Sequence, residues 1–341
     1  MPPTLAERYL AFARDEAAGR SALYEQFSTG VANDAELLSR LAALPVARQQ
    51  PNLLLGAVKF AFGAQPDWPT FRAVTLQHWN DVRSIMLARS TQTNEAARCA
   101  TLLPLLLQLP QPLALLEVGA SAGLCLLPDR YAYDFDGCHL TPADVTAPPC
   151  FACHLEGAVP LPHRLPRIVW RAGLDLNPID VRDDDQCAWL EALVWPDQEQ
   201  RLHRLRAALA VARQDPPRLV RGNLLHDLAG LAAQAPRDAT LVIFHTAVLG
   251  YVSEQAQRDA FARSLGDLDA VWISNEGPGV FPTIAAQLPE RAPRGKFVLA
   301  VDGRPVAFSD AHGAALTWIA GESPVGREIS RATATSGSCT P

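Results

Sequence analysis

The chain has 341 residues, of which 48% are hydrophobic, so it can bury one large core or two smaller ones. Its formal net charge of −6 gives no electrostatic reason to expect nucleic-acid binding. No apolar run approaches the ~18 residues of a membrane span, and no basic segment precedes an apolar core at the N-terminus. We therefore expect a cytoplasmic protein that binds neither nucleic acid nor membrane.

The seven cysteines are an odd number, and a cytoplasmic setting predicts that their thiols are reduced. Residues 150–154 match the C-x-x-C-H pattern of covalent haem attachment. That attachment requires export, and no second pair of ligands stands at the spacing of a zinc site. We therefore predict no metal site.

Residues 1–108 have the apolar spacing of helices and predict an all-helical N-terminal domain or cap. Thr4–Glu7 match a capping box at the start of the first helix. Further helices are expected at 53–62 and, as one longer element, from Pro69 onward. No strand alternation interrupts this part of the sequence.

A polar run at 90–95 leads directly into an apolar helix at 96–107. One interpretation is that it caps the helix, because Ser, Thr and Asn supply capping oxygens and an acid suits the positive end of the helix dipole. The alternative is that Gln92, Asn94 and Glu95 bind a substrate over the glycine loop that follows. The sequence leaves both interpretations open.

From residue 109 to 321 strands and helices alternate, which is typical of a doubly wound, Rossmann-like parallel sheet. The expected strands lie at 113–118, 167–174, 218–221, 240–244, 270–273, 296–301 and 315–319. The last two are expected to be joined by a turn at Asp302–Gly303. The irregular stretch at 128–166 reads as an insertion outside the sheet, and residues 322–341 as a disordered tail.

Polar residues follow the predicted strands at the points where the strands end. They are Glu117 with the loop Gly119–Gly123, then Asp175, Asn223, His245 with Thr246, and Asn275 with Glu276. The carboxyl ends of parallel strands meet at one edge of a sheet, where doubly wound folds bind their ligands. The sequence therefore predicts a ligand site at this edge.

The loop itself favours one class of nucleotide ligand. A nicotinamide dinucleotide calls for G-x-G-x-x-G beneath its pyrophosphate, whereas Gly119–Gly123 lacks the middle glycine. S-adenosylmethionine carries no phosphate but has a cationic amine and a cationic sulfonium, which explain an acid at Glu117. Asp175 is placed to accept hydrogen bonds from ribose hydroxyls.

Three segments resemble class I S-adenosylmethionine-dependent methyltransferases. Glu117–Gly123 resembles their first motif, Gly173–Pro178 the strand ending that holds the ribose, and Gly222–Leu224 the segment that contacts adenine. Almost the whole chain is also similar to a narrower bacterial family of unknown function with a methyltransferase-like core. The segments that carry this similarity are Gln92–Glu95, Leu116–Gly123, Asp129–Tyr131, Arg171–Asp180, Phe244–Leu249 and Asn275–Gly277.

The resemblance implies S-adenosylmethionine as cofactor and a set of residues that hold it. These are Glu117, Gly119, Ala120, Ser121, Gly123, Asp175, Leu176, Asn223, Leu224, His245 and Thr246. Contacts to a small-molecule methyl acceptor are expected from Gln92, Asn94, Glu95 and Asn275. The acceptor and the oligomeric state are not specified by the sequence.

One departure concerns spacing, because 58 residues separate Glu117 from Asp175, against about 20 in a simple βαβ unit. The insertion at 128–166 accounts for the excess if it folds outside the sheet.

Methyl transfer needs a base only where the acceptor must lose a proton. His245, Glu276 and Tyr251 are the candidate catalytic residues, and His245 has a suitable ordinary pKa of about 6.5. An equally favoured interpretation of His245 is a buried histidine that is hydrogen-bonded at a strand end. The alternative for Glu276 is that it holds a neighbouring loop through backbone N–H groups. A binding module without turnover and, less favoured, a nicotinamide oxidoreductase are the alternatives to a methyltransferase.

Overall fold

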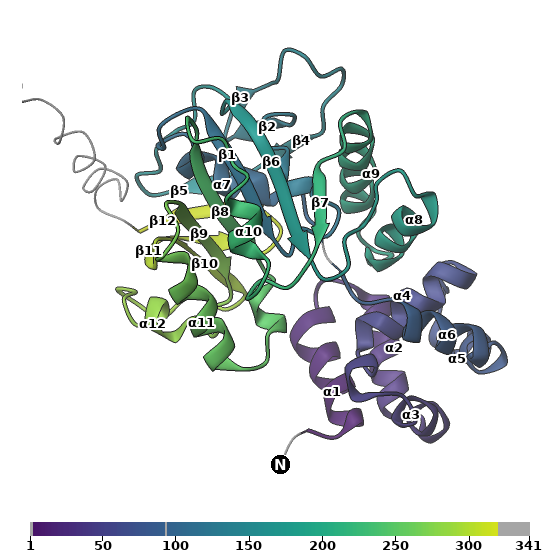
Figure 1. Ribbon diagram of the computed structural model, residues 1–341. Helices are drawn as coiled ribbons and strands as arrows, with labels where there is room; N and C mark the ends of the chain where they lie inside the picture. The colour runs from purple at the N-terminus through teal and green to yellow at the C-terminus, as the bar shows by residue number, and fades with distance from the viewer. Residues whose placement is uncertain (1–2, 93, 320–341) are drawn as a thin grey trace, which may run out of the picture. The chain divides into compact units, whose positions relative to one another are not determined.

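The computed structural model describes residues 3–92 and 94–319, which form two compact units (Figure 1). The first unit consists of 3–92 together with 180–206, and the second of 94–179 together with 207–319. The fold is mixed α/β, with helices preceding a large, mostly parallel sheet, as the sequence predicts. Within the described residues, no helix has the length and apolar character needed to cross a membrane.

The first unit is helical. Its helices are α1 (Leu5–Phe12), α2 (Ala22–Ala32), α3 (Ala35–Ala42), α4 (Pro51–Phe62), α5 (Trp68–Gln77), α6 (Trp79–Ala88) and α8 (Asp184–Leu193). The capping box is confirmed, because the Thr4 side chain accepts from the Glu7 amide and the Glu7 carboxylate accepts from the Thr4 amide. The one long helix expected from Pro69 is wrong, since the chain breaks at His78 into α5 and α6.

Helix α8 joins this unit through both apolar and polar contacts. Trp189 packs in the same core as Tyr9, Phe27 and other buried residues of the N-terminal helices. The Lys59 ammonium donates to the carbonyl oxygens of Glu191 and Val194 at the end of the helix, where carbonyls lack partners from a following turn. Burial lowers the pKa of Lys59 to about 8.

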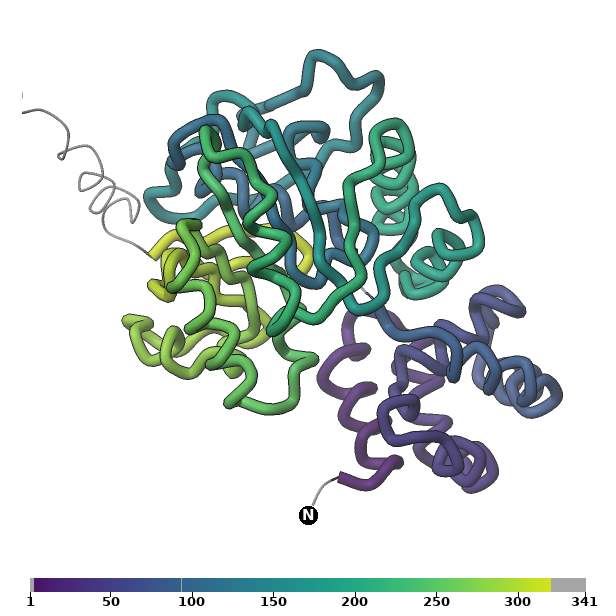
Figure 2. Tube along the Cα trace, viewed as in Figure 1, coloured from purple at the N-terminus to yellow at the C-terminus, as the bar shows by residue number. Residues whose placement is uncertain are grey.

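The second unit contains a nine-stranded sheet in the order β5-β12-β11-β10-β9-β8-β1-β6-β7. Its strands are β1 (Leu113–Val118), β5 (His154–Glu156), β6 (Ile168–Asp175), β7 (Arg218–Arg221), β8 (Thr240–Thr246), β9 (Val271–Glu276), β10 (Lys296–Val301), β11 (Arg304–Asp310) and β12 (Ala315–Trp318). β7, β6, β1, β8 and β9 run parallel to one another. In this order β1 lies between β6 and β8, which are teal and green in the trace of Figure 2.

The chain changes direction across the sheet at β1. From β1 it adds β6 and then β7 on one side, and afterwards returns to add β8 and β9 on the other. This is the point where doubly wound sheets open a crevice beyond the carboxyl ends of the strands. The loops that follow β1, β6, β8 and β9 therefore start at one edge.

The far side of the sheet differs from the expectation. The turn at Asp302–Gly303 connects β10 to β11, an antiparallel strand that the sequence analysis missed, and β12 pairs with β11. The insertion forms its own three-stranded sheet, β3-β2-β4, from β2 (Ala132–Phe135), β3 (Cys138–Leu140) and β4 (Cys150–Ala152). Its last strand, β5, pairs with β12 and becomes the edge of the main sheet, so the insertion is not wholly outside it.

Helices cover the two faces of the sheet (Figure 1). On one face, α10 (Leu228–Ala232), α11 (Gln255–Leu265) and α12 (Pro282–Ala285) contribute Leu228, Phe261 and Ile284 to a core shared with Leu116 and Val118 of β1. Helix α7 (Arg98–Leu106) lies behind the sheet in Figure 1, on the other face. Helix α9 (Glu199–Gln214) runs from the first unit into the second.

Candidate functional site

The loop after β1 is tightly wound and fastened to β6. Gly119, Ser121 and Gly123 have φ angles of 73°, 51° and 70°, and a positive φ is uncommon for a non-glycine residue such as Ser121. The Gly119 amide donates to the Leu174 carbonyl at 2.8 Å, and the Ile179 amide donates to the Ser121 carbonyl at 3.0 Å. The loop therefore has one defined shape, held by its neighbour.

Gly119 has a packing reason as well as a backbone reason. A Cβ added there would lie 2.1 Å from Cγ2 of Val248, in the loop after β8. Gly173 of β6 likewise leaves room for the methyl group of Ala120. In this conformation, protein side chains occupy the space that the small residues leave.

Asp175, at the end of β6, holds the glycine loop. Its Oδ2 accepts from the Ser121 amide at 2.8 Å, and its Oδ1 accepts from the Asn177 amide at 2.7 Å. A carboxylate offers about four lone-pair sites, so each oxygen retains capacity for another donor. The adjoining Leu176 is 62% exposed, which is unusual for a leucine at a strand end.

Asn94 is fastened to the same loop from the other side. Its Nδ2 donates to the Ala120 carbonyl at 3.0 Å, and its Oδ1 accepts from the Leu124 amide at 2.9 Å. The Cys125 thiol donates to the carbonyl of Glu95, a buried residue, at 3.4 Å. The segment around Asn94 therefore supports the glycine loop directly, a role that neither sequence interpretation included.

Side-chain alternation separates the remaining polar residues onto two faces. Leu116 and Val118 face α11, so Glu117 faces α7. Glu117 pairs with Phe244 in the parallel register, so Phe244 and Thr246 share its face while His245 points to the opposite one. By the same rule Asn275, opposite Thr246, lies on the α7 face, and Glu276 lies with His245.

The α7 face contains a buried arginine that joins three segments. Arg98 is 4% exposed, and its guanidinium donates to the carbonyls of Ala311 and Thr246 at 2.8 and 3.0 Å. It also lies 5.9 Å from the centre of the Phe297 ring. Arg98 thus fixes the end of β8 against the turn between β11 and β12.

Two buried polar atoms on the α7 face make no hydrogen bond among the described residues. They are Oε2 of Glu117, an acceptor when ionised, and Nδ2 of Asn275, a donor. The Asn275 Oδ1 is satisfied by the Ser309 hydroxyl at 2.6 Å. Ser121 Oγ, in the glycine loop, is a third such atom. Buried polar atoms of folded proteins nearly always have partners, so these three mark a place where a polar partner fits.

Burial raises the pKa of Glu117 well above its usual range, and the nearby Cys125 and Asp175 raise it further. The Arg98 guanidinium opposes this increase without overcoming it. Burial therefore favours the neutral form of this carboxyl group, and a nearby cation would favour the charged form.

The opposite face holds a buried hydrogen-bond network around His245. His245 is completely buried, and its Nδ1 lies 2.8 Å from Oε1 of Glu276. The indole N–H of Trp272 donates to Nε2 of His245 at 3.0 Å. An indole can only donate, so Nε2 is unprotonated and Nδ1–H donates to Glu276. Both ring nitrogens are thereby occupied.

Glu276 also holds the loop after β8. Its Oε1 accepts from the amides of Val248 and Leu249 at 2.9 and 3.1 Å, in addition to His245. Ala247, at the start of this loop, has a φ of 55°, a strained value for alanine. These contacts give His245 and Glu276 a positioning role, and the catalytic role predicted for them stays a prediction.

Comparison with protein families gives one match. The model of a family described as "Uncharacterized protein conserved in bacteria (DUF2332)" matches residues 6–318. The chain belongs to this family. No curated protein and no solved structure matches the chain. Membership confirms the resemblance to a bacterial family of unknown function and carries no activity with it.

Within this DUF2332 chain, the structure brings some of the predicted residues together and separates others. Glu117, Ser121, Asp175, Asn94 and Thr246 surround the end of β1 through the contacts described above. Asn223 lies in an exposed turn after β7, where its side chain accepts from the Leu225 amide. Tyr251 is 66% exposed in a short helical turn after β8, and Gln92 belongs to the first unit.

Sequence reasoning missed Arg98. It is the first residue of an apolar helix, where a cation opposes the positive end of the helix dipole. This unfavourable position of a positive charge could have drawn attention to Arg98, because a cation there needs hydrogen-bond acceptors from elsewhere in the chain. The part of the chain that the structure describes contains no group of three or more His, Cys, Asp or Glu residues placed to hold a metal.

Proposed function

We propose that this protein is an S-adenosylmethionine-dependent methyltransferase acting on a small-molecule acceptor. The observation that carries the proposal is the buried carboxyl group of Glu117, whose Oε2 has no hydrogen-bond partner among the residues that the structure describes. It lies near the end of β1, the strand at which the chain changes direction across the sheet. A cationic amine is the natural partner for such an oxygen. An ordered water would satisfy the same atom but would not compensate a charge.

The residues around β1 fit the remaining parts of the cofactor. Asp175 retains lone pairs for ribose hydroxyls beyond the two backbone amides that it accepts. Asn223 and Leu224, after β7, occupy the positions that the family resemblance assigns to adenine. The exposed Leu176 offers an apolar surface beside them. Val248, which packs on Gly119, would be the side chain to move as the loop admits a ligand.

When bound, S-adenosylmethionine supplies a methyl group that is already activated. The protein would therefore position the two partners and exclude water rather than generate a strong nucleophile. Both ring nitrogens of His245 are already hydrogen-bonded, so this ring is not free to take a proton from the methyl acceptor. We therefore favour a methyl acceptor that reacts without losing a proton to His245. Asn275, whose Nδ2 is unpartnered on the same face as Glu117, would donate to an acceptor oxygen.

A second candidate is a binding module that holds the nucleoside without turnover. The hydrogen bonds made by both ring nitrogens of His245 and by Oε1 of Glu276 favour it, because these atoms need not change partners in a merely structural role. Turnover separates the candidates. Transfer of a labelled methyl group into a small-molecule extract supports the methyltransferase, and binding without transfer supports the module.

Calorimetry with S-adenosylmethionine, S-adenosylhomocysteine and NAD tests the binding that both candidates share. The adenosyl ligands are expected to bind the wild type, and Glu117→Gln and Asp175→Asn are each expected to weaken binding about tenfold or more, the value of one charged hydrogen bond. Arg237→Gln, at an exposed position three residues before the start of β8 and so at the opposite end of the sheet from Glu117, is the matched control. No heat with either adenosyl ligand, or a preference for NAD, would contradict the proposal.

A further inference from the structure

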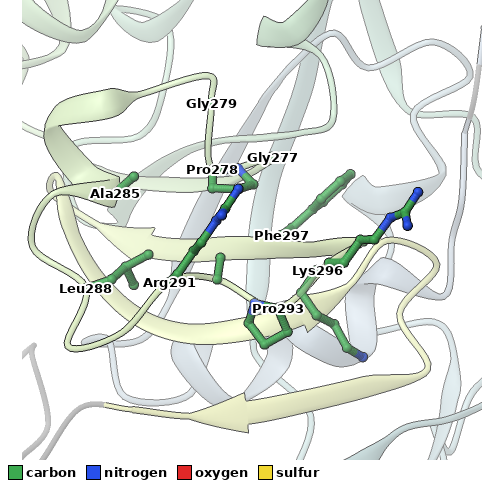
Figure 3. A pocket seen from close by; sticks show the side chains of 12 residues that line it. Gly277, Pro278, Gly279, Ala285, Leu288, Arg291, Pro293, Lys296 and Phe297 are labelled. Carbon is green, nitrogen blue, oxygen red and sulfur yellow. The ribbon is translucent and has the colours of Figure 1, made fainter. Parts of the chain in front are cut away.

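A second concave site lies beyond the end of β9, where Glu276 is followed by Gly277, Pro278 and Gly279. A cavity of about 970 Å³ opens there between this loop, α12 and the start of β10. Figure 3 shows the side chains that line it. The volume is at the upper end of the range for small-molecule pockets, which is about 300–1,000 Å³.

Three cationic residues line this groove within six positions of the chain. They are Arg291, Arg294 and Lys296, and no acidic residue belongs to the lining. Figure 3 shows Arg291 reaching from its loop toward Gly277 and Pro278, across the groove. The Lys296 ammonium lies 3.9 Å from Asp310, a loose pair that leaves most of its charge available.

The rest of the lining is apolar. Ala285 and Leu288 contribute from α12 and the residues after it, and Phe297 contributes from the start of β10. The Phe297 ring also lies 5.9 Å from the guanidinium of Arg98, the buried arginine that fixes the end of β8. The groove therefore combines a positively charged rim with a hydrocarbon floor anchored to the core of the sheet.

We propose that this groove binds a small organic anion, a carboxylate or a phosphate carried on an apolar body. Arginine forks pair with both acid groups in two-point hydrogen bonds, and Lys296 adds a point charge. The floor of Leu288 and Phe297 accepts the apolar body. The two glycines of the loop let an acid group approach backbone N–H groups without steric obstruction. This binding does not depend on methyl transfer or on the site around Glu117.

The test uses three probes with one apolar body: 2-naphthoate, 2-naphthyl phosphate and neutral 2-naphthalenemethanol. Titration of the full-length protein by calorimetry is expected to show at least one anion binding tenfold or more tightly than the alcohol, with affinity falling as salt is raised. Whichever anion binds more tightly identifies the acid group. Equal binding of the alcohol, or no binding of either anion, would overturn the proposal.

Variants assign the binding to this groove. Arg291→Gln is expected to weaken anion binding about tenfold, the effect of one charged hydrogen bond, and Arg291→Lys to weaken it less. Arg237→Gln, which removes an equally exposed arginine elsewhere, is expected to bind as the wild type does. Since Arg291 is exposed, its replacement leaves the fold intact. Wild-type anion affinity in both Arg291→Gln and Arg294→Gln would place the binding elsewhere.

Discussion

The two faces of the sheet differ at its carboxyl edge in how completely their buried polar groups are satisfied. On the α11 face, His245 and Glu276 use both ring nitrogens and one carboxylate oxygen in four hydrogen bonds. On the α7 face, Glu117 and Asn275 each keep a buried polar atom that has no partner within 3–92 and 94–319. A saturated network stabilises one arrangement, whereas an unsaturated one leaves capacity for a ligand. We therefore propose that the α11 face supports the loop after β8 and that the α7 face binds a ligand.

The largest loss of stability is expected from removing Glu276 from the hydrogen-bond network around His245. Glu276→Ala leaves the Nδ1–H of His245 and the amides of Val248 and Leu249 without an acceptor, so stability should fall by about 3–5 kcal/mol. Urea unfolding measures this loss. Glu276→Gln, which retains an acceptor oxygen, is the matched control and should recover part of the loss. A small loss for alanine would show that the network is not the support of the β8 loop.

The contact that joins the two loops comes next. Gly119→Ala places a methyl group against Val248 and adds strain at a positive φ, so it should cost roughly 2–4 kcal/mol. Adding Val248→Ala should return part of that stability, because it removes the clash and leaves only the backbone strain. Unfolding of both single variants and the double variant measures the coupling. Strictly additive losses would mean that the loops pack differently.

For Glu117, on the α7 face, we expect a substitution that stabilises the protein instead of destabilising it. The pKa of Glu117 is raised by burial above its unfolded value of about 4.3, so the stability linked to its proton is complete below pH 4 and is lost as the pH rises through the folded pKa. Glu117→Gln should therefore match the wild type near pH 4 and become progressively more stable than the wild type as the pH rises toward 8. Thermal unfolding across this pH range checks the sign. A variant less stable than the wild type at pH 8 would mean that the carboxylate has a partner.

The smallest effect is expected at the edge of the glycine loop. Asn94→Ala removes the acceptor of the Leu124 amide, so that amide should exchange its hydrogen about five- to tenfold faster, while global stability changes by about 1 kcal/mol. Hydrogen exchange followed by NMR measures the rate. The amide of Trp272, which donates to Asp302 far along the chain, is the internal control and should not change.

Much of this edge could be predicted from the sequence, because buried parallel strands and their polar endings are local signals. β1 begins and ends at the predicted residues, and the endings at Asp175, His245 and Glu276 lie at or within one residue of a strand end. The side of the sheet to which each ending points was not predictable. It depends on the register between strands, which sets Glu117 beside Phe244 and therefore opposite to His245.

Two further features needed the structure for other physical reasons. β11 was missed because Pro305, which lacks an N–H, argues against a strand, and the pairing tolerates it only through a register shift beside Ala300. Arg98 was missed because its acceptors, the carbonyls of Thr246 and Ala311, lie 148 and 213 residues away. Side chains that bond distant backbone leave no local pattern.

We propose that burial holds the Glu117 carboxyl toward its neutral form until a cationic ligand binds, and the protons released on binding test this most directly. Titration of S-adenosylmethionine at pH 6.5, in two buffers of different ionisation enthalpy, gives that number from the difference in heat. The amine of the ligand is already protonated at this pH, so release reports on the protein. We predict a net release of protons by the wild type and none by Glu117→Gln. Binding without proton release, or unchanged release in Glu117→Gln, would contradict the account.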